Sequence, residues 1–431
     1  MLKLFKDRNF VTLWLGEFVS VVGDHISMIA FPFLVLQLTG SPGLTALVFA
    51  VQGLPRAILM LVGGAIVDRS SPRNVMMITN LLRCGFVFLL SYLLYIDQIN
   101  LEVIFTIALL FGLADAFFYP AATSVVPSVV SKEDLKSGNA IMQGSVWVGV
   151  ILGPVIAGFA IAGEVTTMGH GTGMDAATFD SNRAGFARAF FLDGLTFAFS
   201  FLTLLFVRTR SLKGDGDGEN SSMFAEVKKA VKWVWSVPAI RLGFLGVAVL
   251  EFFFQTPIFV GLPALTKARF LEPAYVYGLI VSAYGAGALV GAMTAGSLNW
   301  PSRENLVRTM FFIFIGSGAS IGLIVLYEHY WFAMALFLVF GAMDSYIWVH
   351  FTTFVQQSTP EAQMGRVMSI FMFMSVGLIP IASVIMGVAF EWNLEVALLI
   401  ASSVIVLSCL VMALHPDSKK VPALVESDEE G

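Results

Sequence analysis

Long apolar stretches constrain the fold of this chain more than any other feature. Twelve stretches of about 20 mostly apolar residues follow one another along the 431 residues, and only 13% of the residues are charged. A soluble protein has about 25% charged residues, and about 20 apolar residues span a bilayer as a helix. We therefore predict an all-α integral membrane protein. The predicted transmembrane helices cover residues 10–36, 44–67, 74–95, 102–126, 139–162, 186–207, 238–264, 274–297, 305–326, 330–355, 364–389 and 394–414.

A degraded internal repeat divides these helices into two sets of six. Residues 111–117 resemble residues 340–346, and the offset between Asp115 and Asp344 is 229 residues. A repeat of about half the chain length indicates two copies of one structural unit. We predict two pseudo-symmetric six-helix bundles, residues 1–207 and 238–414. A carboxylate within an apolar stretch is costly in lipid, so Asp115 and Asp344 are candidate functional residues. Matched polar residues in two repeats are typical of secondary transporters.

The lysines and arginines predict the orientation of the chain. If the N-terminus is cytoplasmic, 19 of the 25 basic residues lie in cytoplasmic segments and four lie in outer segments. This bias predicts that both termini are cytoplasmic. Residues 208–237 form a predicted linker with an amphipathic helix over 223–235, residues 163–185 a solvated outer loop, and residues 415–431 an acidic cytoplasmic tail. Cys84 and Cys409 lie in apolar stretches and show no metal-binding spacing.

The loop after the second predicted helix carries the first recognisable motif. Gly64, Asp68, Arg69 and Arg73 match the loop signature Gly-x-x-x-Asp-Arg-x-Gly-Arg-Arg/Lys, and the stretch resembles the major facilitator superfamily. The resemblance implies that this loop latches the two halves together at the cytoplasmic gate of the outward-facing state. Ser71 and Pro72 depart from the signature, which leaves the strength of the latch open.

A second motif lies in the fifth predicted helix. Gly149, Gly153, Pro154 and Gly158 resemble the signature of proton-coupled antiporters in the same superfamily, although Ala157 replaces one glycine. Small residues four apart also let two helix backbones approach closely, which would produce a similar pattern. Residues 130–140 and 359–369 resemble cytoplasmic loops of macrolide-efflux and siderophore-exporter relatives, so the resemblance favours the drug–proton antiporter subgroup.

In the superfamily, helices 1, 4, 7 and 10 line a central cavity, and each of these helices here carries an acid. The candidate proton-coupling residues are Glu17, Asp24, Asp115, Glu251 and Asp344. Burial favours the neutral form of a carboxylic acid, which suits a proton carrier, whereas a nearby arginine favours the charged form. Arg56 and Arg83 are candidate buried partners of these acids. For Asp24 two interpretations stay open, an ion pair with Arg56 on the adjacent helix or a proton site.

Aromatic residues beside these acids would suit amphipathic, often cationic, ligands. The candidates for a substrate pocket are Phe117, Phe118, Tyr119, Phe252, Gln255, Tyr346 and Trp348. The sequence has no nucleotide-binding P-loop, no nucleophile motif, no zinc motif and no nucleic-acid-binding patch. We therefore expect no catalytic residue, metal or cofactor, and a proton gradient rather than ATP as the energy source.

These features predict a monomeric, multi-pass protein of the inner cell membrane that interacts with lipids but not with nucleic acid. The expected function is proton-coupled export of amphipathic small molecules, such as drugs, macrolides or siderophores, by alternating access. Two alternatives stay open, a lipid or lysophospholipid flippase of the same fold and a transporter-like receptor without transport. An enzyme is not expected, because no nucleophile and base recur at usable spacing. The sequence does not name the substrate.

Overall fold

The computed structural model describes residues 3–131, 134–162, 176–209, 223–295, 298, 300–360 and 364–420. Among the described residues, twelve helices are long and apolar enough to span a membrane. The prediction of an all-α protein with twelve membrane spans is therefore confirmed.

Six helices form the N-terminal half, and their ends carry the capping residues that the sequence offers. Ser41 accepts a hydrogen bond from the Leu44 N–H (2.9 Å) and Asn100 accepts one from the Val103 N–H (2.9 Å), so each side chain satisfies a free N–H of a helix start. The helices are α1 (Arg8–Thr39), α2 (Pro42–Arg69), α3 (Pro72–Tyr95), α4 (Leu101–Val129), α5 (Leu135–Ala162) and α6 (Ala176–Phe206), with a 3-10 turn η1 (Leu4–Lys6) before α1.

The C-terminal half also has six spans, two of which are built from several helical segments. The seventh span runs through α8 (Pro238–Leu250), two π-helical turns η2 (Glu251–Gln255) and η3 (Pro257–Gly261), and α9 (Leu262–Arg269). The eleventh joins α13 (Met364–Met372), the π-helical turn η6 (Phe373–Gly377) and α14 (Ile379–Trp392). The others are α10 (Pro273–Ala295), α11 (Leu306–Leu326), α12 (Tyr330–Ser358) and α15 (Leu394–Leu414), with 3-10 turns η4 (Arg303–Asn305) and η7 (Pro416–Lys419).

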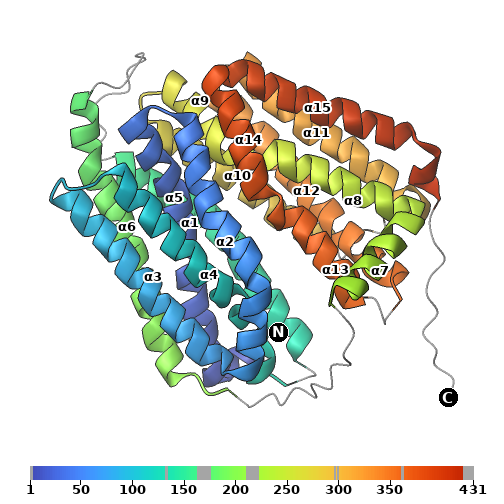
Figure 1. The fold of residues 1–431 in the computed structure, drawn as a ribbon, viewed down its shortest axis with the longest axis horizontal. Helices are drawn as coiled ribbons and strands as arrows, with labels where there is room; N and C mark the ends of the chain where they lie inside the picture. Colours follow the sequence, from blue (N-terminus) through green and yellow to red (C-terminus); the bar gives the residue numbers. More distant parts are fainter. Residues whose placement is uncertain are drawn as a thin grey trace.

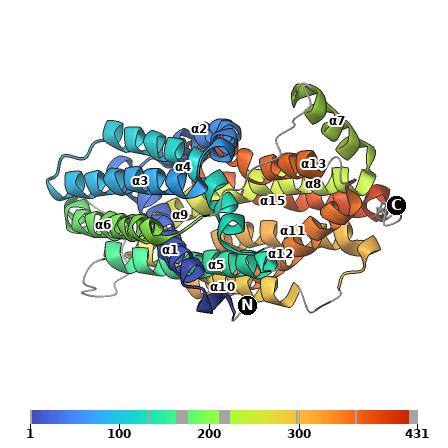
Figure 2. The same ribbon diagram turned by 90° about the horizontal axis from the view of Figure 1, so that it is seen from below.

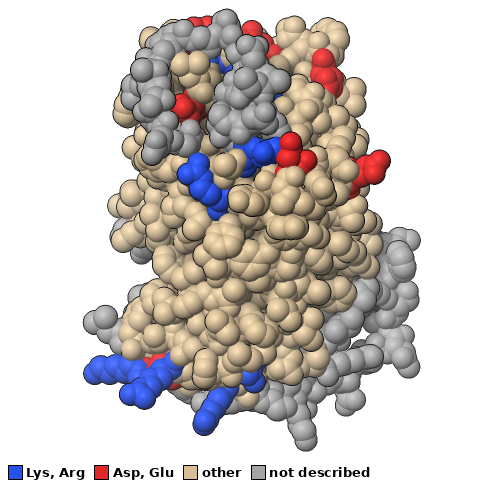
Figure 3. Space-filling view, turned by 90° about the vertical axis from the view of Figure 1, so that its left-hand side faces the viewer, with Lys and Arg blue, Asp and Glu red and all other residues tan. Residues whose placement is uncertain are grey.

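The two halves lie side by side, and α9 and α14 lie beside the turn between α1 and α2 (Figure 1). We call the end of the molecule that contains this turn and the segments that follow α9 and α14 the outer end. On the face drawn in Figure 3, charged side chains gather towards the two ends and an uncharged band separates them. Such a band is what a membrane-spanning protein presents to lipid.

The sequence repeat corresponds to a repeated packing contact. Gly112 of α4 lies against the carbonyl oxygen of Gln52 in α2, and Gly341 of α12 lies against the carbonyl oxygen of Tyr284 in α10. These glycines occupy equivalent positions, three residues before Asp115 and Asp344. A missing Cβ lets two helix backbones touch, so each half uses the same helix contact beside its acid.

Gly112→Ala is expected to destabilise the protein, because the added Cβ would overlap a backbone oxygen that cannot rotate away. Overpacking of this kind costs about 1–3 kcal/mol. Gly85→Ala in α3 is the matched control, since a Cβ there meets nothing within 4 Å. Thermal unfolding in detergent should show a lower midpoint for Gly112→Ala alone. Equal midpoints for both variants would contradict the close contact.

The close approach of small residues also joins the two halves. The interface is made mainly by α5 with α10 and by α2 with α14. Gly158 of α5 lies against the backbone of Tyr275, and Gly278 of α10 lies against the Pro154 carbonyl. The Ser282 hydroxyl donates a hydrogen bond to the Ile151 carbonyl (2.8 Å).

The structure corrects the predicted start of the sixth transmembrane helix. Residues 176–185 continue α6 rather than forming a loop, and Arg183 in this extension forms an ion pair with Asp97 beyond α3. This ion pair stabilises the part of α6 that extends beyond the predicted apolar span. The rest of the predicted outer loop, 163–175, lies outside the described residues.

The predicted acidic tail begins with an ordered turn. Asp417 in η7 accepts from Arg241 (2.8 Å) and pairs with Lys420 (2.6 Å), and the Lys420 hydrogen bond is the main cause that lowers the pKa of Asp417. Residues 421–431 lie outside the described part of the chain.

A helix, α7 (Met223–Ser236), lies where the amphipathic helix of the linker is predicted, at the edge of the C-terminal half (Figure 2). Its Val234 is buried, whereas Lys229, Val231 and Trp235 are exposed. Residues 210–222 of the linker lie outside the described residues.

Candidate functional site

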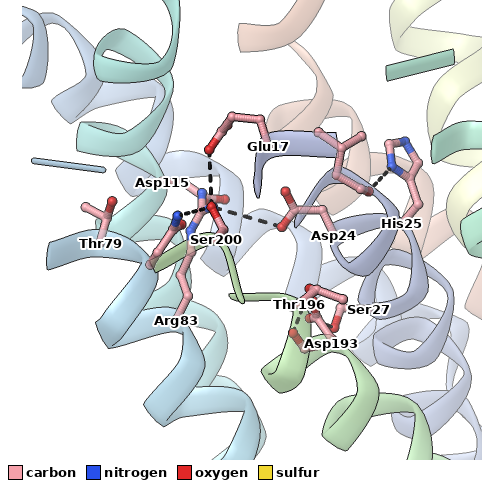
Figure 4. Close-up of polar contacts among 12 residues, drawn as sticks. Glu17, Asp24, His25, Ser27, Thr79, Arg83, Asp115, Asp193, Thr196 and Ser200 are labelled. Carbon is pink, nitrogen blue, oxygen red and sulfur yellow. Dashed lines mark hydrogen bonds and ion pairs between the residues drawn. The ribbon is translucent and has the colours of Figure 1, made fainter. Parts of the chain in front are cut away.

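A buried cluster of charged side chains lies inside the N-terminal half (Figure 4). Arg83 of α3, only 1% exposed, donates a hydrogen bond to Asp115 of α4. The Arg83 guanidinium also lies 4.0 Å from the Asp24 carboxylate of α1. Arg56 of α2 approaches the other oxygen of Asp115 at 3.8 Å. Asp115 therefore lies between two arginines.

Aromatic rings enclose the guanidinium group of Arg83. Its central carbon lies 3.9 Å from the ring centroid of Phe118, 5.4 Å from that of Phe197 and 5.7 Å from that of Phe111. The negative face of an aromatic ring attracts a cation most strongly where water is excluded. The rings and the two carboxylates together compensate for the burial of this charge.

Of the two interpretations of Asp24, the structure does not show the ion pair with Arg56, which pairs with Asp115 instead. The physical reason is the Gly112 contact, which brings α2 against α4 at Gln52, one helical turn before Arg56. Arg56 consequently lies beside α4, and its guanidinium stacks over Tyr119 at 5.6 Å. The prediction that Arg83 is a buried charge partner is confirmed.

Two further acids of this half are held by hydrogen bonds rather than by arginines. Glu17 is 5% exposed and accepts from the Ser200 hydroxyl (3.3 Å), which in turn accepts from the Asn80 amide (2.9 Å). Asp193 of α6 is fully buried and accepts from Ser27 and from Thr196 (3.2 Å).

Sequence analysis missed these hydrogen-bonding partners. A signal exists in α6, where Asp193, Thr196 and Ser200 recur at helical spacing and so share one face. Polar residues on one face of an otherwise apolar helix point into the bundle.

The C-terminal half carries a different arrangement. Glu251 begins the π-helical turn η2 and is 7% exposed, with Gln255 beside it on the next turn. Asp344 of α12 accepts a hydrogen bond from the Tyr284 hydroxyl (2.7 Å) and lies close enough to Glu251 to interact with it electrostatically. Among the described residues, one oxygen of Glu251 and one of Asp344 are buried without a hydrogen-bond partner.

The acids of the two halves therefore differ in their partners. Asp115 has two arginine partners, whereas neither Glu251 nor Asp344 forms an ion pair within the described part of the structure. An unpaired carboxylate inside a membrane protein is costly unless it carries a proton or a cation lies beside it. A π-helical turn is also frequent at functional sites. Glu251 and Asp344 form the candidate site for an exchangeable ion, and we call them the acid pair.

The aromatic pocket candidates fall into two groups. Phe118 is buried over Arg83, Tyr346 is buried and donates to the Trp300 carbonyl, and Trp348 packs against Phe371 with ring centroids 5.0 Å apart. Phe118 and Tyr346 thus pack the interior, whereas Trp348 is half-buried and its role in binding stays a prediction. Phe117, Phe252 and Gln255 are partly exposed and Tyr119 is 41% exposed, so their role in binding stays a prediction.

The loop signature is described only in part. Arg73 donates to the carbonyls of Leu204 (2.6 Å) and Leu205 (2.8 Å). Arg73 thereby binds the free carbonyls at the end of α6, which attract a cation. The side chains of Asp68 and Arg69 and the surroundings of Gly64 lie outside the described part.

The antiporter-like glycines lie at close helix contacts. Gly149 and Gly153 lie against Val21 and His25 of α1, whereas Gly158 faces α10 of the other half. Helix α5 is thus packed between α1 and the C-terminal half, so a movement of α5 would also move the interface between the two halves.

Twelve spans in two repeated halves, with buried acids at equivalent positions, define a membrane transporter. The chain belongs to the major facilitator superfamily, whose family model matches residues 13–384. It is similar to the enterobactin exporter EntS of Salmonella choleraesuis, with 24% identity over 362 residues, 83% of this chain and 80% of the relative. The corresponding exporter of Citrobacter koseri is 25% identical over 365 residues, which cover 83% of this chain and 79% of the relative.

Solved structures show the same fold. The nucleoside transporter NupG matches with a TM-score of 0.71 and 12% identity, over 94% of this chain and 98% of that one. A bacterial homologue of the iron transporter ferroportin in its inward-facing state matches with a TM-score of 0.68 and 17% identity, over 95% and 99%. The described residues contain no group of three or more His, Cys, Asp or Glu residues that could hold a metal ion.

Proposed function

We propose that this transporter exports amphipathic small molecules across the inner membrane in exchange for protons. The observation that carries the proposal is the acid pair, in which each acid has one buried oxygen without a partner and neither has a basic partner among the described residues, while Asp115 has two arginine partners. A carboxylate of this kind can take up a proton from one side of the membrane and release it to the other. No nucleotide is needed for such a cycle.

In the proposed cycle the two six-helix halves rock around the site between them. The acid pair carries a proton while the site faces the outside and exchanges it for substrate at the inside. The chain termini lie in the cytoplasm, as the distribution of lysine and arginine predicts. Similarity to enterobactin exporters supports the direction of transport and a siderophore as one candidate substrate.

Transport into inverted membrane vesicles tests this function. Vesicles that contain the protein should accumulate a substrate from a panel of dyes, macrolides, catecholate siderophores and lysolipids when their interior is acidic, and a protonophore should abolish this accumulation. Vesicles prepared without the protein are the control. Accumulation that is indifferent to the proton gradient would contradict proton coupling. Movement of lysolipid alone would favour the flippase alternative, and binding without accumulation would favour a receptor.

A further inference from the structure

Two charged side chains of the C-terminal half bind the turn between α1 and α2 at the outer end. The Lys267 ammonium of α9 donates to the Leu36 carbonyl of α1 at 2.6 Å. The Glu391 carboxylate of α14 accepts from the Gly43 N–H of α2 at 3.0 Å and from the Ser41 hydroxyl. The partners lie 231 and 348 residues apart in sequence, so both contacts join the two halves.

The sign of each charge matches the helix end that it contacts. Helix α1 ends at Gly40 and exposes carbonyl groups, which form the negative end of its dipole and suit a lysine. Helix α2 begins at Pro42 and exposes N–H groups, which form the positive end of its dipole and suit a glutamate. The turn between α1 and α2 therefore presents a negative and a positive helix end to the C-terminal half.

Close packing places Glu391 at the start of α2. Gly387 of α14 lies against Ala46 and the backbone of Gly43. Gly43 in turn packs against Glu391, since a Cβ added at Gly43 would lie only 2.7 Å from the Glu391 Cγ. Figure 1 shows α9 and α14 beside the upper ends of α1 and α2. The contacts of Lys267 and Glu391 can form only while the halves touch at this end.

We propose that Lys267 and Glu391 form a clamp on the turn between α1 and α2, which holds the outer end closed and must release for that end to open. The contacts suit a reversible device. Each charged group binds a helix terminus rather than a buried charged residue, so release into the water at this end leaves no lone buried charge. The inference rests on the alternating-access part of the proposed function, but not on its proton coupling or its substrate.

The C-terminal half also contains a control pair, Arg269 and Glu395, whose charged groups make similar contacts that stay within this half. Arg269 donates to the Ile324 (3.0 Å) and Val325 (2.7 Å) carbonyls at the end of α11 and pairs with Glu395 at 2.8 Å. Arg269 and Glu395 are thus charged residues at the outer end that need not separate during a rocking motion.

Distances between spin labels on the detergent-purified protein test the clamp. Labels at exposed Gln98 and Glu328 report on the outer end of the two halves, and labels at exposed Asn74 and Glu304 report on the other end. Both natural cysteines, Cys84 and Cys409, are buried, which favours labelling at the introduced sites. No gradient or substrate is needed, so failure of the clamp and failure of proton coupling remain distinguishable.

Lys267→Met and Glu391→Ala should each increase the ratio of long to short outer distances, with a shift of about fivefold or more in the double variant. Lys267→Met should act more strongly, because Lys267 is half-buried whereas Glu391 is exposed and screened by solvent. The distances at the other end should shorten in parallel, while Arg269→Met and Glu395→Ala should leave both sets unchanged.

Unchanged outer distances in the double clamp variant would overturn the inference, as would an equal shift in the Arg269→Met, Glu395→Ala double control. Lys267→Gln and Glu391→Gln remove the charges but keep polar side chains, and they test the contribution of the charges if Lys267→Met or Glu391→Ala impairs folding. Thermal unfolding of each variant verifies that the measured protein is folded.

Discussion

Arg83→Met is expected to destabilise the protein by about 3–5 kcal/mol, the range for removing one partner of a buried ion pair. The substitution removes the guanidinium that binds Asp115 and lies 4.0 Å from Asp24, and it also removes the cation that Phe118 covers. Arg56, at 3.8 Å from the second oxygen of Asp115, can compensate only in part.

A double-mutant cycle separates the ion pair from the packing of the aromatic rings. Asp115→Asn should partly rescue Arg83→Met, because the carboxylate that Arg83 binds directly is then neutral, while Asp24 at 4.0 Å keeps its charge and limits the rescue. Arg188→Met is the matched control, since Arg188 is an exposed arginine on α6 whose Nε donates to the Ala184 carbonyl in the same helix. Thermal and denaturant unfolding in detergent give the coupling free energy. Additive effects of Arg83→Met and Asp115→Asn would show that the pair contributes no net stability.

Glu251→Gln and Asp344→Asn are expected to abolish gradient-driven accumulation while they leave the fold intact. The acid pair has no basic partner among the described residues, so its neutralisation leaves no uncompensated charge. Neutral side chains cannot load or release a proton, so accumulation should fall to the level of vesicles without the protein.

Exchange of substrate for substrate across the vesicle membrane should continue in these variants, because exchange needs no net proton movement. Glu395→Gln is the matched control, as Glu395 is an acid of the same half that lies at the outer end and pairs with Arg269. Asp115→Asn provides a second contrast and should lower stability rather than uncouple transport. Full gradient-driven accumulation in the Glu251→Gln, Asp344→Asn double variant would remove the acid pair from the proton pathway.

The pattern of residues along the chain was sufficient to predict the helices and their division into two halves. The apolar stretches predicted the twelve spans, and the repeat predicted two equivalent halves, in which Gly112 and Gly341 make equivalent helix contacts. Helix formation and membrane insertion depend on neighbours along the chain, so apolar length, caps and small-residue spacing are enough to recognise them.

The partners of the polar side chains were decided only by the tertiary structure. The sequence indicated that Asp24, Arg56, Arg83 and Asp115 lie within the membrane, but not that Arg56 would face Asp115. A residue number fixes the depth of a side chain in a helix of about 1.5 Å rise per residue, whereas its partner depends on how each helix is rotated against its neighbours. That rotation is set by packing between residues far apart in sequence, which is also why the Lys267–Leu36 contact, 231 residues apart, had no sequence signal.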